Sequence, residues 1–397
     1  MVDFKNMVLN RVKLKRKISS KGNEQIDKVF LAIISIILGF GLLIVYEATV
    51  VYSDTVFGGK YHFLLLQSAW ISIGIVGMVI ISKLNLDWVQ KISPYIFLVA
   101  ILLLMFILIE SPFAPSVYGA KRWFVLNPKP FPELPIIGRI SFQPSEFAKL
   151  ASIIFFASFL SSRKIIEEKG AKPLLKFFVL LGLVCGLILV EPDFTTAFIT
   201  AVILIIMFFL SEFNLAYFMV SAPILALIAG LYAFSFEYRR ERIQTLLNPE
   251  SIDKMGAGYH IRQIMIALGS GGFFGLGLGH SRQKYAYLPE VMSDSIFAII
   301  GEELGFLGTT LIVTLFCVMI LRGMKISHNS NNPFGSLLSA GVIAWISIQA
   351  LINLGAMSRL LPLTGVPLPL ISYGGSSIIF MLWGLGFVLN VSRNGDK

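Results

Sequence analysis

Residues 29–50 read VFLAIISIILGFGLLIVYEATV, an apolar run in which Glu47 is the only charged residue. A helix that crosses a bilayer needs about 20 mostly apolar residues, and this run is long enough. The preceding residues 1–28 are polar and basic, which is typical of a cytoplasmic tail. A signal peptide is excluded, because the run is too long and no small-residue cleavage site follows it. The stretch therefore predicts a first membrane span with a cytoplasmic N-terminus.

Similar apolar runs continue along the whole chain of 397 residues, of which 56% are hydrophobic and 14% charged. Soluble domains carry about 25% charged residues, so the composition also indicates a membrane protein. Hydropathy predicts ten spans: 29–50, 62–82, 94–110, 145–162, 174–190, 194–210, 213–235, 296–321, 334–354 and 375–392. We therefore expect an all-α polytopic bundle in which residues 29–392 form one transmembrane domain between the tails 1–28 and 393–397. Both tails are expected in the cytoplasm.

The formal net charge of +10 is concentrated at the predicted membrane edges. Short inward loops carry Lys83, Lys91, Arg322 and Lys325, in agreement with the positive-inside rule. This distribution indicates contact with anionic membrane lipids and argues against a nucleic-acid partner. The two cysteines lie in separate apolar runs, so neither a disulfide nor a metal site is expected from them.

Three predicted outward segments are long or rich in polar motifs: 111–143, 236–295 and 355–374. The largest, 236–295, joins spans seven and eight. These segments hold basic residues that the orientation rule does not explain, and an anionic substrate would account for them. The last segment is dense in proline and glycine, which is typical of a broken re-entrant segment that lines a polar cavity.

The segment 236–295 contains the glycine-rich stretch 269–279, GSGGFFGLGLG. Backbone N–H groups of such a stretch could approach a phosphate. The spacing matches no nucleotide-binding motif, so we favour the alternative that the glycines allow close packing of a short re-entrant helix.

Asp294 lies where the segment 236–295 re-enters the membrane. A partly desolvated carboxylate can act as a general base, but from position alone a helix N-cap is the favoured interpretation. Glu302 and Glu303 follow inside the span, where ionisable groups are costly and usually functional. Asp294 and Glu302 are eight residues apart, so they could share one helix face.

Two further groups of charged residues lie at outward ends of spans. Glu146 and Lys149 are spaced i, i+3 and can pair, as a structural ion pair or as substrate contacts. The sequence Glu191-Pro192-Asp193 is expected to form a tight turn, and a solvated turn would account for it.

These stretches together resemble the SEDS family (shape, elongation, division, sporulation). The matching stretches, in the order of the family, are 119–123, 142–149, 191–194, 238–242, 267–279, 287–290, Asp294, 300–306 and 361–377. The resemblance implies a ten-helix membrane fold that polymerises lipid II, with a class B penicillin-binding protein as the crosslinking partner. It also implies that Asp294 is catalytic and that Glu146 and Lys149 contribute to activity. Ser293 and Ser295 stand where the family usually has threonine and phenylalanine.

The chemistry that the resemblance implies is inverting glycosyl transfer at the outer face of the bacterial cytoplasmic membrane. Asp294 would deprotonate the acceptor hydroxyl, and an undecaprenyl pyrophosphate leaving group would need cations. The substrate-binding candidates are Arg122, Glu146, Lys149, Arg239, Arg240, Arg242, Lys284 and Glu302. A divalent cation such as Mg²⁺ or Mn²⁺ is a further candidate, and no other cofactor is expected. We expect a role at the division septum, together with divisome proteins.

Three alternatives to this prediction stay open. The chain could move lipid II as a flippase or secondary transporter, but polar groups should then gather near the midplane at a repeat interface, and no internal repeat is evident. It could polymerise glycan in cell elongation. It could also be a scaffold that recruits a synthase, in which case Asp294 would be dispensable.

Overall fold

The computed structural model describes residues 26–116, 120–133, 138–162, 172–211, 257–285 and 288–394. Within these ranges the regular secondary structure consists of helices and of two strands of two residues each, β1 (Phe124–Val125) and β2 (Ser141–Phe142), which pair antiparallel. The helices are α2 (Lys28–Phe57), α3 (His62–Ile81), α4 (Leu86–Leu108), α5 (Pro144–Leu160), α7 (Lys172–Val190), α8 (Phe194–Leu210), α11 (Ala257–Gly271), α12 (Ile296–His328), α13 (Pro333–Met357) and α14 (Gly375–Asn394).

Nine of the ten predicted spans correspond to described helices, and the all-helical prediction is confirmed. Seven of the described helices are long and apolar enough to cross a membrane. The predicted span 213–235 lies outside the described residues. α4 begins at Leu86, eight residues before the predicted start, because the Asn85 side chain caps it and Pro94 is accommodated inside the helix. α11 was not predicted as a helix.

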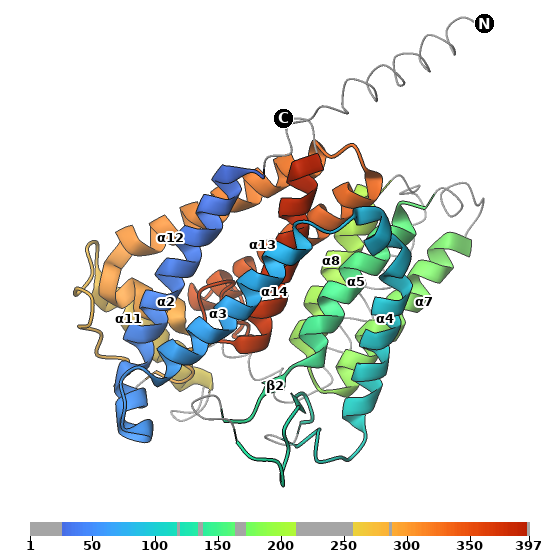
Figure 1. The fold of residues 1–397 in the computed structure, drawn as a ribbon. Helices are drawn as coiled ribbons and strands as arrows, with labels where there is room; N and C mark the ends of the chain where they lie inside the picture. The colour runs from blue at the N-terminus through green and yellow to red at the C-terminus, as the bar shows by residue number, and fades with distance from the viewer. Residues whose placement is uncertain are drawn as a thin grey trace, which may run out of the picture.

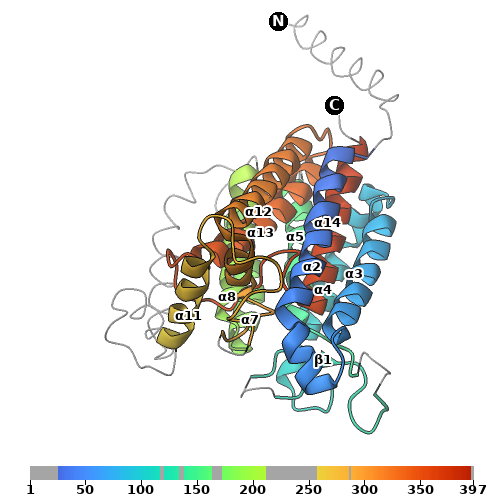
Figure 2. The ribbon, with the colours of Figure 1, turned by 90° about the vertical axis from the view of Figure 1, so that its left-hand side faces the viewer.

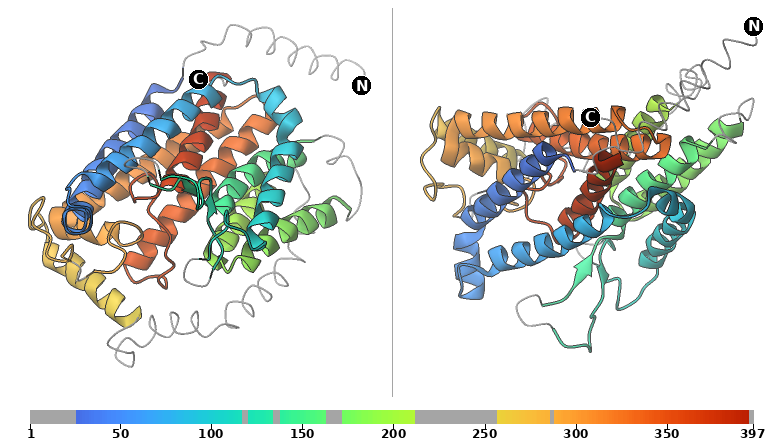
Figure 3. Two further views of the ribbon diagram at one scale, coloured as in Figure 1. Left: turned by 60° about the horizontal axis from the view of Figure 1, so that its bottom comes forward. Right: turned by 45° about the horizontal axis from the view of Figure 1, so that its top comes forward.

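α13 and α14 form the centre of the bundle (Figure 1). α13 packs against α5, α8, α12 and α14, while α14 also packs along α3. In the apolar windows of α13 and α14, 72% of residues are buried, against 28% in α3. The outer helices therefore present apolar side chains to lipid. The segment that carries β1 and β2 projects from one end of the helices (Figures 1 and 3).

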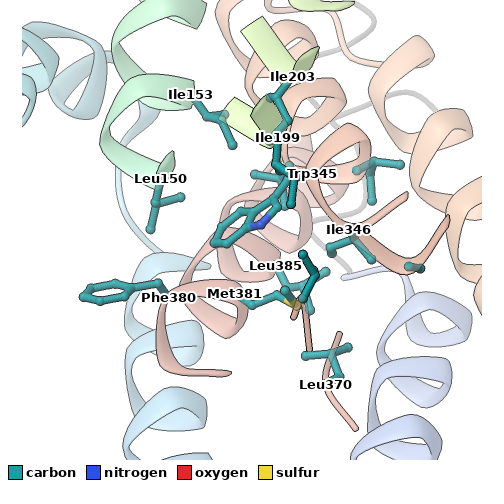
Figure 4. Close-up of a cluster of buried hydrophobic side chains, with 14 of the residues drawn as sticks. Leu150, Ile153, Ile199, Ile203, Trp345, Ile346, Leu370, Phe380, Met381 and Leu385 are labelled. Atoms are coloured by element: carbon teal, nitrogen blue, oxygen red, sulfur yellow. The ribbon is translucent and has the colours of Figure 1, made fainter. Parts of the chain in front are cut away.

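An apolar cluster joins the four helices α5, α8, α13 and α14 around Trp345, which is fully buried. Ile153 of α5, Ile199 of α8 and Met381 of α14 pack in this cluster (Figure 4). Close packing of such side chains gives helices a defined position. The cluster therefore fixes the N-terminal end of α5, where Glu146 and Lys149 lie.

α12 is broken at Gly305, whose φ of 65° and ψ of −160° are not helical. The glycine-rich stretch fills the break. Backbone N–H groups of Leu276 and Gly277 donate to the carbonyl oxygens of Glu302 and Glu303 (both 2.9 Å). In return, the N–H groups of residues 306 and 307 donate to the carbonyl oxygens of residues 272 and 273. Every backbone group in a membrane needs such a partner.

This pairing explains why glycine is needed at the break. A Cβ atom on Gly275 would overlap the carbonyl group of Glu303, and one on Gly305 would overlap the backbone of residues 273 and 275. Because the N–H groups of residues 275–277 already donate within the protein, they are not available to a phosphate. The structure thus supports close packing as the role of Gly271 and Gly275 in this stretch.

Candidate functional site

A cavity of about 730 Å³ opens between the outward ends of several helices. This volume lies within the range of small-molecule and cofactor sites. The charged side chains that line it are Arg122, Glu146, Lys149 and Asp193. Its walls come from the segment before α5, the turn between α7 and α8, residue Ser293, α13, and residues 362–367 and 373–377. Segments far apart in the sequence therefore converge on one polar space.

Glu146 and Lys149 form a buried ion pair in the first two turns of α5. The distance from Lys149 Nζ to Glu146 Oε1 is 2.7 Å, with side chains only 2% and 8% exposed for Lys149 and Glu146. Lys149 Nζ also lies 5.0 Å from the centre of the Trp345 ring. Glu146 Oε2 is buried without a hydrogen-bond partner among the described residues. The predicted pairing is confirmed, and one carboxylate oxygen of the pair remains available to a ligand.

Asp193 joins two walls of the cavity. Its Oδ1 accepts a hydrogen bond from the backbone N–H of Thr196 (3.1 Å) and so caps α8. Its Oδ2 accepts a hydrogen bond from Gln143 Nε2 (2.9 Å), just before α5. The sequence analysis did not single out Asp193 or Gln143 as site residues. The available signals were a polar residue before each of two spans and the position of both residues in stretches that match the family.

Arg122 holds the turn between α7 and α8. Its Nε donates to the carbonyl oxygen of Glu191 (3.1 Å), and its Nη2 donates to that of Pro192 (2.5 Å). Pro192 has a positive φ of 30°, an unusual conformation that needs support from its surroundings. Arg122 lines the cavity, but these two donors are engaged within the protein.

The structure contradicts the expectation that residues 191–193 form a solvated turn, because Glu191 is buried. The residue is only 1% exposed, and neither of its carboxyl oxygens has a hydrogen-bond partner among the described residues. Burial raises the pKa of Glu191 from 4.5 to about 8; the nearby Asp193 also raises it, and Arg122 lowers it. Glu191 is therefore mostly neutral at pH 7, because the fold withdraws it from water while Arg122 binds its backbone.

Asp294 does not itself line the cavity, but it lies beside Ser293 and Gly365, which do. It is 5% exposed, and a Cβ atom on Gly365, which lines the cavity, would be 3.9 Å from Asp294 Oδ2. Asn353 Nδ2 donates to the carbonyl oxygens of both Asp294 (2.8 Å) and Val366 (2.7 Å). The N-cap of α12 is Ser295, so the structure does not support Asp294 as the cap. One carboxylate oxygen therefore lies close to the cavity.

Asn353 and Gln349 are functional candidates that the sequence analysis missed. Gln349 Nε2 donates to the carbonyl oxygen of Pro367 (3.1 Å), one turn of α13 away from the Asn353 contacts. Both amides therefore hold the segment between α13 and α14 against α13. Two polar residues spaced i, i+4 in an apolar helix were a signal that could have identified them.

Lys284 lies in a separate cluster outside the cavity. Its Nζ is 3.1 Å from Glu303 Oε1 and 3.5 Å from Glu47 Oε2, which belongs to α2. The Lys284 side chain is 3% exposed. The ammonium group thus binds two carboxylates within the protein and ties the segment before α12 to α2.

Glu302 belongs to the same cluster. Its carboxylate accepts hydrogen bonds from Ser281 Oγ and from the backbone N–H groups of Arg282 and Gln283. It is 1% exposed and does not line the cavity. Asp294 precedes α12, so it does not share a regular helix face with Glu302.

Three predicted residues, Arg239, Arg240 and Arg242, lie outside the described residues, as does Tyr287 of a matching stretch. Among the residues that are described, no group of three or more His, Cys, Asp or Glu side chains is placed to hold a metal ion.

The fold and the cavity define a class: an all-helical polytopic membrane protein with a polar, carboxylate-bearing cavity at the ends of its helices. The family model for cell cycle proteins that covers FtsW, RodA and SpoVE matches residues 27–397. The chain belongs to this family, the SEDS family, which confirms the resemblance found in the sequence.

Similar proteins span nearly the whole chain. Stage V sporulation protein E of Bacillus subtilis is 38% identical over 376 residues, which are 92% of this chain and 97% of that protein. The probable peptidoglycan glycosyltransferase FtsW of Coxiella burnetii is 36% identical over 367 residues, covering 91% and 94%.

Solved structures share the fold. A chain from the work "Structural coordination of polymerization and crosslinking by a peptidoglycan synthase complex" has a TM-score of 0.74 and 24% identity, covering 93% of this chain and 98% of that one. RodA of Thermus thermophilus has a TM-score of 0.67 and 23% identity, covering 94% and 98%.

Proposed function

We propose that this protein is an inverting peptidoglycan glycosyltransferase that polymerises lipid II at the outer face of the bacterial cytoplasmic membrane. The observation that carries the proposal is the placement of Asp294, a nearly buried carboxylate next to Gly365, which lines the cavity that also holds Glu146 and Lys149. The FtsW protein of Coxiella burnetii, which is named a probable peptidoglycan glycosyltransferase, is similar over 91% of the chain and supports the general activity.

The proposed reaction is a single displacement. Asp294 removes the proton of the acceptor sugar's 4-hydroxyl, and the oxygen attacks the anomeric carbon of the growing glycan. The bond from that carbon to undecaprenyl pyrophosphate breaks, and the configuration inverts. A single displacement needs one general base, rather than the nucleophile and acid of a retaining hydrolase.

The leaving pyrophosphate needs positive charge close to it. Arg122 and Lys149 are the basic residues that line the cavity among the described residues, so we propose that these two stabilise the leaving pyrophosphate. Arg239, Arg240 and Arg242 remain candidates in the same role. We no longer favour Lys284 and Glu302, because each is bound within the separate cluster. Glu146 would orient Lys149 and offer its second oxygen to a sugar hydroxyl.

We propose a class B penicillin-binding protein as the partner and septal synthesis during cell division as the setting. The synthase complex that shares the fold coordinates polymerisation with crosslinking, which supports a partner of this kind. A fluorescent fusion that gathers at the division site in growing cells is the expected result. A fusion along the side wall would favour elongation, and one confined to sporulating cells would favour a sporulation role.

The proposed activity is tested with purified protein and labelled lipid II, with glycan products separated on a gel. Asp294→Asn keeps the side-chain volume but removes the base, so we expect the loss of glycan chains with unchanged lipid II binding. The matched control is Asp87→Asn, an exposed aspartate in the first turn of α4.

Near wild-type glycan synthesis by Asp294→Asn would contradict the assignment of the base. Transfer of lipid II across vesicle membranes without any polymerisation by the wild type would instead favour the transporter alternative.

A further inference from the structure

Three side chains from two elements form a hydrogen-bonded chain that ends at Asp294. Ser295 Oγ lies 3.3 Å from Asp294 Oδ1, and His260 Nε2 lies 2.6 Å from Ser295 Oγ. His260 belongs to the first turn of α11, which packs against α12 (Figure 2). Ser295 is fully buried, and His260 is half-buried. The chain therefore leads from the cavity wall towards a less buried position.

A general base in a buried site has a second task after each bond is formed. Asp294 gains one proton per sugar added and must lose it before it can act again. The carboxylate is 5% exposed, so direct exchange with bulk water is restricted. A hydroxyl can accept and donate a hydrogen bond at the same time, and imidazole can take up a proton near neutral pH.

We propose that Ser295 and His260 form the proton-release path of Asp294; this proposal rests on the proposed role of Asp294 as the base. The carboxylic acid of Asp294 gives its proton to Ser295 Oγ while the Ser295 hydroxyl gives its own proton to His260 Nε2. Asp294 returns to the carboxylate, Ser295 remains neutral, and His260 becomes an imidazolium that releases the proton to water.

Other charged and titratable groups near His260 come from the elements packed around it. α11 itself carries Tyr259 and Arg262. The part of α12 before its break at Gly305 carries Glu302 and Glu303, whose carboxylates accept hydrogen bonds from residues 281–284. α13 carries no charged residue between Pro333 and Met357. Within the part of the chain that the structure describes, the hydrogen bonds through Ser295 connect the imidazole to the Asp294 carboxylate.

The path is tested by the pH dependence of lipid II polymerisation by the full-length protein. His260 must be neutral to accept a proton, so the wild-type kcat should fall on the acidic side, where the imidazole becomes protonated. His260→Gln and Ser295→Ala should move this acidic limb to lower pH. We expect each to reduce the plateau kcat on the order of tenfold, equivalent to about 1.4 kcal/mol, with KM unchanged.

Two further variants separate the path from a structural role. The double variant His260→Gln/Ser295→Ala should be no slower than either single variant, because both residues act in series. Ser295→Thr keeps the hydroxyl and should retain the wild-type pH profile. The matched control is His280→Gln, an exposed histidine whose Nδ1 contacts the carbonyl oxygen of Leu278. It should leave both kcat and the pH profile unchanged.

Each negative result of these experiments leads to a different conclusion. A lower kcat with an unchanged pH profile in His260→Gln and Ser295→Ala would overturn the path and leave only a structural contact. The same holds if both variants behave as wild type. If these variants fail the test while Asp294→Asn is inactive, the proposed function stands without the path. An active Asp294→Asn would overturn both.

Discussion

Removal of Lys149 should separate the structural role of the buried pair from its catalytic role. Lys149→Met preserves most of the side-chain volume but leaves the Glu146 carboxylate, 8% exposed, without its ammonium partner. Breaking a buried pair in this way costs about 3–5 kcal/mol. Loss of the cation–π contact with Trp345 adds about 0.5–2 kcal/mol. We therefore expect a clear decrease in the midpoint of thermal unfolding in detergent.

The double variant Glu146→Gln/Lys149→Met removes both charges. Replacement of a buried pair by neutral groups of similar volume is often neutral, or stabilising by about 1–4 kcal/mol. We thus expect the unfolding midpoint to return to the wild-type value or above. Glycan synthesis, measured with labelled lipid II under the same conditions, should stay absent because the cation at the cavity wall is missing.

The refuting result is a double variant that regains both stability and glycan synthesis. The pair would then only support the bundle, and the cations for the pyrophosphate would have to come from Arg122 or from the outward segment 236–295. A single Lys149→Met variant with wild-type stability would refute the stated burial cost instead.

Two other predictions follow from the contacts. Gly275→Ala should lower stability and slow glycan synthesis, because the added Cβ would overlap the Glu303 carbonyl group. The control is Gly269→Ala, whose Cβ would meet nothing within 4 Å and which should behave as wild type in both assays. The pKa of Glu191 is about 8 in the folded protein instead of the ordinary 4.5, so the fold favours the protonated form of this side chain. The stability that this preference contributes should be present at pH 4.5 and lost as the pH rises towards 8. Glu191→Gln should remove this slope in unfolding midpoints measured from pH 5 to 8, and an identical slope in the variant would contradict the burial argument.

Much of the fold could be predicted, because a bilayer imposes a length and an apolar composition on each span. The runs at 194–210 and 296–321 begin where the structure begins α8 and α12. α11 escaped prediction because it is shorter and carries Tyr259, His260 and Arg262, so hydropathy does not detect it. The break in α12 also escaped, since Gly305 looks like an ordinary glycine until its partners in 272–277 are known.

Asp294 was identified through the family resemblance; from the residues alone, the site was predictable only where local spacing decides the contact. Glu146 and Lys149 pair because i, i+3 neighbours lie on one face of a helix. Lys284 looked like an outward cation, but its carboxylate partners Glu47 and Glu303 come from two different helices. Such long-range contacts are set by tertiary packing, which the sequence pattern alone does not specify.

The position of Asp294 follows from two features that hold it from opposite sides. Residues 296–303, the part of α12 before the break, are entirely buried, and the break at Gly305 lets this part deviate from the axis of the longer part that follows. On the other side, Asn353 binds the backbone of Asp294 and of Val366 with one amide group. Because both contacts act on the backbone, a small shift of either segment moves the carboxylate relative to Gly365 and the cavity. The outward segment that fills the break is bound to this part of α12 by backbone hydrogen bonds and by the Glu302 and Glu303 carboxylates, so it is connected to the helix that follows the proposed base.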